Sequence, residues 1–189
     1  MDIKVNQSIV PGSIAAIANR DGLTLAESFL NCEVLVVIDQ SGSMGERDAP
    51  GGRSRYDAAD GELQRLQKQH PGRVGVIEFS SAVKFCPGGL PSRDGGGTNM
   101  AAALNFARVS DGACKIVLIS DGEPDRKNET LVAARRYRHP IHTVYIGPEG
   151  GAGRDFLNQL AAATGGRSFE STAPGLLGEG VSQLLLLKS

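Results

Sequence analysis

The stretch that decides the fold of this chain is VLVVIDQSGSM, residues 34–44. Its first five residues are apolar without alternation, a pattern typical of a strand buried on both faces of a parallel sheet. Asp39 ends the run, and a polar loop follows. A second stretch of the same kind, IVLISDGEP over residues 116–124, reaches Asp121 in the same way. Each stretch therefore predicts a strand that carries an aspartate at its carboxyl end.

Segments of strand length and helix length alternate along the chain. We expect strands over residues 34–39, 74–79, 82–85, 114–120, 141–146 and 167–169. We expect helices over residues 56–69, 99–109, 128–138, 155–163 and 176–187. The alternation predicts an α/β fold with a doubly wound, mostly parallel sheet. Residues 82–85 follow the preceding strand almost at once, so we expect them to form an antiparallel edge strand.

The amino-terminal part of the chain gives weaker signals. Ser13 can cap a short helix over residues 14–19, and Asp21-Gly22 would end that helix. We interpret residues 1–32 as an N-terminal extension packed on a domain of residues 33–189.

Composition narrows the class of protein. The chain has 189 residues and a net charge of -1, which suits one domain with a full core and disfavours a nucleic-acid binder that relies on bulk charge. The longest apolar runs have strand length, and the first residues lack the pattern of a signal peptide. We therefore expect a cytoplasmic protein without a membrane partner. Cys32, Cys86 and Cys114 are widely spaced without a CxxC pair, so we expect reduced thiols rather than a disulfide framework or a zinc site.

Oxygen-bearing side chains gather at the ends of the two buried strands. Right-handed crossovers place the loops after parallel strands at one edge of the sheet, where ligands bind at the point of strand-order reversal. The glycines at 95–97 give the next polar residue freedom to approach from another loop. Carboxylates and hydroxyls together suit a hard divalent cation such as Mg²⁺. The candidate ligands are Asp39, Ser41, Ser43, Thr98 and Asp121.

This pattern resembles the metal-ion-dependent adhesion site (MIDAS) of the von Willebrand factor A (vWA) domain family. The family motif is Asp-x-Ser-x-Ser followed by a distant Thr and a distant Asp, and all its elements stand here in order. The segments at 36–44 and 118–124 look typical of prokaryotic intracellular members. The resemblance covers residues 33–187 and assigns the vWA domain to residues 33–189.

The resemblance implies a Rossmann-like, six-stranded sheet in the order 3-2-1-4-5-6, with one antiparallel edge strand and helices on both faces. It also implies a bound divalent cation: Mg²⁺ first, with Mn²⁺ or Ca²⁺ as alternatives. Family members are mostly non-catalytic and bind a protein partner whose exposed Asp or Glu completes the metal shell. Prokaryotic members often act beside AAA+ ATPases, so a component of such a system is one candidate partner.

Other interpretations stay open on the residues alone. Each serine taken singly is more easily explained as a loop cap, whereas the five residues together favour metal ligation. A phosphatase that uses Asp39 as phosphate acceptor requires a second acid two residues on, where Ser41 stands. The alternatives are a metal-dependent phosphoesterase and a structural subunit braced by its metal. Arg53 and Arg55 are either surface residues or a cation beside the metal that favours an acidic ligand.

Overall fold

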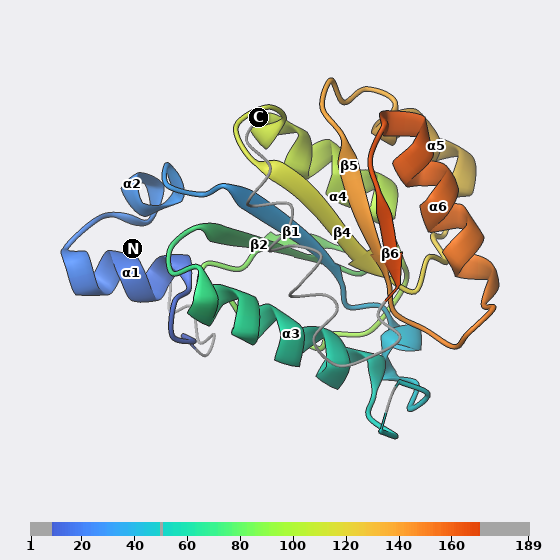
Figure 1. Cartoon of the computed structure of the whole chain (residues 1–189), viewed down its shortest axis with the longest axis horizontal. Coiled ribbons are helices and arrows are strands. Elements are labelled where there is room, and N and C mark those ends of the chain that lie inside the picture. The colour runs from blue at the N-terminus through green and yellow to red at the C-terminus, as the bar shows by residue number, and fades with distance from the viewer. Residues whose placement is uncertain (1–8, 50, 171–189) are drawn as a thin grey trace.

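The computed structural model describes residues 9–49 and 51–170, which form a twisted six-stranded sheet with helices on both faces (Figure 1). The strand order is β3-β2-β1-β4-β5-β6, and only the β2–β3 pairing is antiparallel. The strands are β1 Val34–Asp39, β2 Val74–Phe79, β3 Val83–Phe85, β4 Lys115–Ser120, β5 Ile141–Tyr145 and β6 Ser168–Glu170. The predicted α/β class, sheet order and antiparallel edge strand are confirmed.

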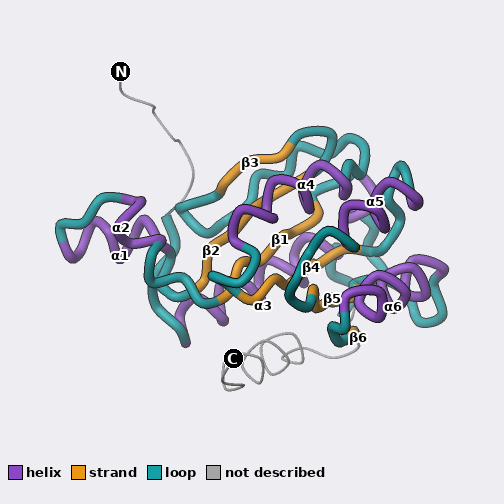
Figure 2. Tube along the Cα trace, turned by 90° about the horizontal axis from the view of Figure 1, so that it is seen from above, coloured by secondary structure: helices purple, strands orange, loops and turns teal. Residues whose placement is uncertain are grey.

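Helices cover the sheet unevenly. The helix α3, Arg55–Gln69, packs on one face, and α4, α5 and α6 pack on the other (Figure 2). Their bounds are α4 Met100–Ala107, α5 Lys127–Ala134 and α6 Ala152–Thr164. The apolar run of β1 explains why helices cover both faces of the sheet, because all six of its residues are buried and alternate between the two faces. The helix expected over residues 176–187 lies outside the described part of the chain.

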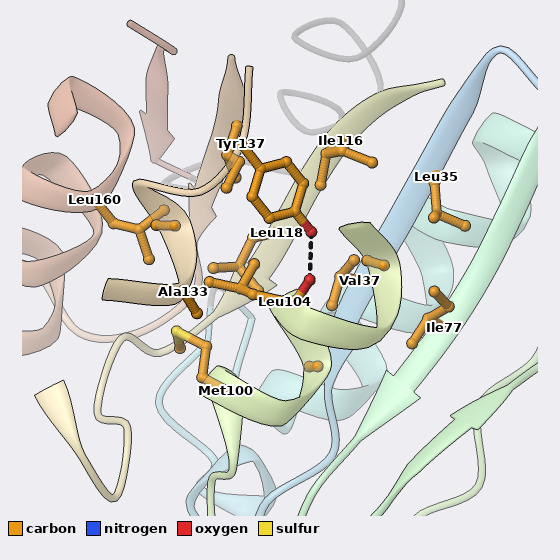
Figure 3. Packing of buried hydrophobic residues seen from close by; sticks show 14 of the residues in the cluster. Leu35, Val37, Ile77, Met100, Leu104, Ile116, Leu118, Ala133, Tyr137 and Leu160 are labelled. Atoms are coloured by element: carbon orange, nitrogen blue, oxygen red, sulfur yellow. Dashed lines mark hydrogen bonds between the residues drawn. The ribbon is translucent and has the colours of Figure 1, made fainter. Parts of the chain in front are cut away.

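The core under α4 and α5 shows why α5 is shorter than expected (Figure 3). The helix ends at Ala134, so the arginines at 135, 136 and 138 lie beyond its last turn. The chain leaves the helix to bury Tyr137, whose hydroxyl donates to the Leu104 carbonyl at 2.5 Å. Burying the ring and satisfying its hydroxyl outweighs four more residues of helix.

The two amino-terminal helices, α1 Ile14–Asp21 and α2 Leu25–Phe29, lie beside the β2–β3 edge and the start of β1. The Ser13 side chain caps α1 as expected, and Gly22 ends it with a positive φ of 68°. Phe29 packs edge-to-face on Phe85 with 5.5 Å between ring centroids. This contact attaches α2 to the edge strand.

Strand order places the reversal point between β1 and β4. The chain runs from β1 outward to β2 and β3, then returns to build β4, β5 and β6 on the other side. Two parallel strands whose crossovers leave in opposite directions open a crevice beyond their carboxyl ends. Asp39 is the last residue of β1 and Asp121 directly follows β4, so both aspartates lie at this crevice.

Candidate metal centre

Asp39 is the most buried carboxylate of the candidate site. Its Oδ1 accepts the Ser41 amide at 2.8 Å, and its Oδ2 accepts the Ser120 hydroxyl at 2.6 Å. Burial raises the pKa of Asp39 to about 6. Hydrogen bonds from Ser120 and Ser41 lower this pKa, and the nearby charge of Asp121 raises it further. Within residues 9–49 and 51–170, no Lys, Arg or His forms an ion pair with this carboxylate. The site therefore holds a buried acid whose neighbours are neutral donors.

The loop after Asp39 turns its hydroxyls toward each other. Ser41 precedes a short 3-10 helix, Gly42–Gly45, and the Ser41 and Ser43 Oγ atoms lie 3.2 Å apart. Met44 is fully buried against the sheet and fixes the far side of this turn. The Tyr56 hydroxyl of α3 donates to the main-chain carbonyl of Ser41 at 2.5 Å. These contacts fix the backbone of the serine loop, so the fold determines where the two hydroxyls lie.

Thr98 reaches the site from the glycine-rich loop before α4. The Gly42 amide donates to the Gly96 carbonyl at 3.0 Å, which joins this loop to the serine loop. Gly96 has a φ of 96°, a conformation that favours glycine. The Thr98 amide donates to Asp125 Oδ1 at 3.0 Å, and the Thr98 carbonyl accepts the Asp125 amide at 3.1 Å. This pair of bonds ties the loop before α4 to the loop after β4.

Asp121 differs from Asp39 because it has a cationic partner. Its Oδ2 accepts Arg55 Nη1 at 2.9 Å, and Arg55 also donates through Nε and Nη2 to Asp48 at 2.8 and 2.6 Å. The hydrogen bond to Asp48 raises the pKa of Arg55, so the guanidinium stays charged at any working pH. Gly153 at the start of α6 packs against the Asp121 carbonyl, and a Cβ there would lie 1.8 Å from that oxygen. The aspartate is therefore fixed from both sides.

The donor chemistry fits a hard divalent cation. The residues offer carboxylate and hydroxyl oxygens, which Mg²⁺, Mn²⁺ and Ca²⁺ prefer. Across the described residues no group of three or more His, Cys, Asp or Glu side chains can hold a metal, so an ion here depends on the hydroxyls. The buried Asp39 carboxylate supports the fit further, because a buried charge is stable only when it is paired or bound to a metal.

The structure brings the sequence-predicted residues to one edge of the sheet, and it adds three that the motif did not name. Asp39, Ser41 and Ser43 are joined by side-chain bonds, whereas Thr98 connects to them through the backbone of its loop. The added residues are Ser120 and Asp125, together with Arg55, which the sequence left open as a surface residue or a cation beside the site. The sequence does carry a signal for Ser120, because it is the last residue of β4 and the neighbour of Asp121.

Comparison with known proteins supports this fold, although no protein-family model matches the chain. Calcium-activated chloride channel regulator 1 of Equus caballus is 31% identical in an alignment of 156 positions that covers 70% of this chain and 16% of that protein. The chain thus spans about a sixth of the length of the curated relatives it matches.

Two solved structures share the architecture. An aerotolerance-related membrane protein from Bacteroides fragilis matches with a TM-score of 0.66 at 18% identity, over 80% of this chain and 97% of that one. A von Willebrand factor type A structure from Catenulispora acidiphila matches with a TM-score of 0.58 at 20% identity, over 81% and 42%. The chain has the von Willebrand factor A fold. In this vWA fold the candidate metal centre lies at the carboxyl ends of β1 and β4.

The vWA fold also leaves a hollow next to Thr98. A cavity of about 280 Å³ opens between the starts of α4 and α5, with Asn99, Asp125, Arg126 and Glu129 among its lining residues. Arg126 and Glu129 pair with each other at 3.0 Å on the exposed side. The candidate centre is therefore bordered by a polar depression.

Proposed function

We propose that this vWA domain is a divalent-cation-dependent protein-binding module. Its metal ligands are Asp39, Ser41, Ser43, Thr98 and Asp121, bound directly or through water. When bound, the cation supplies a coordination position that an exposed Asp or Glu of a partner protein fills. The module is not an enzyme in this proposal, and Mg²⁺ is the expected ion, with Mn²⁺ or Ca²⁺ as substitutes.

One observation carries the proposal. The Asp39 carboxylate is completely buried, accepts the Ser120 hydroxyl and the Ser41 amide, and has no cationic side chain paired with it among the described residues. Leaving an acid in that state costs stability unless a cation arrives or a proton binds. Hydroxyls complete the shell of a divalent ion without adding charge, so the neighbours of Asp39 suit this role.

Arg55 supports an acidic ligand rather than a basic one. Its guanidinium is only 11% exposed and lies at Asp121, so it adds positive potential next to the expected ion. A positive site bordered by fixed charge attracts a carboxylate and rejects a cationic side chain. The depression beside Thr98 gives space for residues that flank the acidic one in the partner.

The first test measures metal binding to the full chain. Isothermal titration with Mg²⁺ and Mn²⁺ should give one site in the wild type and none in Asp39→Ala. Asp21→Ala is the matched control, because Asp21 is an exposed acid on α1 that pairs with Arg20. Equal binding by wild type and Asp39→Ala would overturn the metal assignment.

The second test measures partner capture. A pull-down from native lysate in Mg²⁺ should enrich a protein that is lost with EDTA and with Asp39→Ala, but kept with Asp21→Ala. Mutating acidic residues of the enriched protein should then abolish its binding. Metal that raises the melting temperature without affecting capture would instead favour a structural role, and metal-dependent turnover of phosphate esters would favour the phosphoesterase alternative.

We also propose a cytoplasmic location, with a component of an AAA+ ATPase system as one candidate partner. In the described residues, no helix has the length and apolar character that a membrane crossing requires. One structural relative is nevertheless described as a membrane protein. Fractionation of cells that express the tagged full-length protein tests the location, and a signal in the membrane fraction would contradict it.

A further inference from the structure

Two cysteines stand at the opposite end of the strands that carry the two aspartates. Cys32 lies seven residues before Asp39, and Cys114 lies seven residues before Asp121. Because β1 and β4 are parallel neighbours with Val34 opposite Lys115, the two cysteines lie side by side where these strands begin. The fold therefore brings together two thiols separated by about 80 residues of chain.

The contacts around the thiols are close. The Cys114 thiol donates to the Cys32 carbonyl at 3.4 Å, and the Lys115 amide donates to the Glu33 carbonyl at 2.8 Å. The Cys32 Sγ accepts the Gly75 amide at 3.3 Å, which holds it over the strand pair. Both cysteines belong to the same apolar cluster and are 5% and 7% exposed.

The two thiols also act on each other's ionisation. Their interaction raises the pKa of Cys32 and lowers the pKa of Cys114. The third cysteine, Cys86, hydrogen-bonds to the Leu90 carbonyl on the other face of the sheet and belongs to a different cluster.

We propose that Cys32 and Cys114 form a reversible disulfide when the protein meets a peroxide. The Cys114 thiolate attacks one peroxide oxygen, the O–O bond breaks, and Cys114 becomes a sulfenic acid as hydroxide leaves. Cys32 then loses its proton and attacks the Cys114 Sγ, and the S–O bond breaks as a second hydroxide leaves. Two thiols and one hydrogen peroxide give one disulfide and two waters, so the peroxide is the only co-reactant required.

Burial of the pair favours this product over further oxidation. A peroxide molecule is small enough to reach a thiol at a slightly exposed position, whereas a bulky disulfide reagent is not. The Cys114 thiol is hydrogen-bonded to the Cys32 carbonyl, so the resolving cysteine is adjacent when the sulfenic acid forms and consumes it before a second peroxide arrives. The bond would fasten β1 to β4 at their amino ends, remote from the candidate metal centre, and it does not depend on that centre.

The experiment uses the full chain, first reduced and then freed of reductant. Treatment with hydrogen peroxide should lower the intact mass by two hydrogens, and peptide mapping should find Cys32 linked to Cys114. Because the bond closes a loop of about 80 residues, the melting temperature should rise by roughly 10 °C and return on addition of dithiothreitol. Cys86→Ala is the matched control and should behave as the wild type does.

Three results would overturn the proposal. One is a native, peroxide-treated protein whose Cys32 and Cys114 still react with an alkylating reagent after unfolding. Another is a gain of two or three oxygens at Cys114 without a cross-link. The third is a cross-link that contains Cys86. None of these readouts requires a cysteine variant at the proposed site, so they hold even where Cys32→Ala or Cys114→Ala fails to fold.

Discussion

Replacing Arg55 with Gln should make the domain bind divalent cations more tightly. The guanidinium holds Asp121 at 2.9 Å, so an incoming ion must compete with it for one of the expected ligands. The ion would also come to rest close to a fixed positive charge that is 11% exposed. Both effects weaken the binding of the cation, and Arg55→Gln removes both.

The size of the effect follows from Coulomb's law. A divalent ion about 5 Å from a guanidinium is repelled by roughly 7 kcal/mol at an effective dielectric constant of about 20 and by roughly 2 kcal/mol in bulk water. The lower figure is the better guide, because Arg55 can move outward with Asp48, whose side chain is 35% exposed. About 2 kcal/mol corresponds to roughly 30-fold tighter binding.

Isothermal titration with Mn²⁺ at fixed ionic strength measures this difference. Arg20→Gln is the matched control, since Arg20 is an arginine paired with an adjacent acid on α1, and it should leave the affinity unchanged. Metal-free Arg55→Gln should also melt below the wild type, because Asp121 loses its ion pair. Added metal should remove this difference in melting temperature. Binding of Mn²⁺ that is unchanged or weaker in Arg55→Gln would refute the idea that the guanidinium and the ion compete.

Four further changes probe the site, its support and the core. Burial raises the pKa of Asp39 from 3.8 to about 6, so its contribution to stability is complete below pH 3.8 and is lost as the pH rises through 6. Metal-free wild type should thus lose about 2 kcal/mol relative to Asp39→Asn between pH 4 and pH 6 in urea unfolding, whereas stabilisation by Mg²⁺ should grow over the same interval. Gly153→Ala should weaken metal binding and lower stability by about 1–3 kcal/mol, because its Cβ would overlap the Asp121 carbonyl. Gly61 lies inside α3, and a Cβ there would meet only Arg53 Nη1 at an unstrained 3.8 Å, so Gly61→Ala should instead stabilise the protein by about 0.5–1 kcal/mol in the same unfolding assay. Tyr137→Phe should cost about 1 kcal/mol in chemical unfolding through the lost hydrogen bond to α4.

Much of the fold is predictable because the strands have simple patterns. The strands predicted over residues 34–39 and 74–79 match β1 and β2 residue for residue, because every residue of these two strands is buried. The position of the candidate site follows from the same patterns, because parallel topology brings carboxyl ends together without knowledge of any side-chain contact.

Contacts between distant loops were not predictable. Arg55 and Asp121 are 66 residues apart, and their pairing depends on the path of the loop before α3. The end of α5 was also missed, because helical periodicity continues past Ala134 while the core requires Tyr137 to turn inward. The proximity of Cys32 and Cys114 was not predicted for the same reason, because they come together only when β1 and β4 are neighbours. Tertiary packing decides each of these cases.

The two carboxylates of the candidate site are in unlike states, and the difference makes the proposed exchange physically reasonable. Asp121 already has a cation, whereas Asp39 has only neutral donors. If an ion arrives, Asp39 gains the counter-charge that its burial lacks, and Arg55 gives up one bond to Asp121. Arg55 keeps its two-pronged pair with Asp48, so the exchange leaves no buried guanidinium unpaired. Metal entry then trades one ion pair for the neutralisation of a buried acid, which is why the loop that carries Asp48 and Arg55 should control how strongly this domain binds its cation.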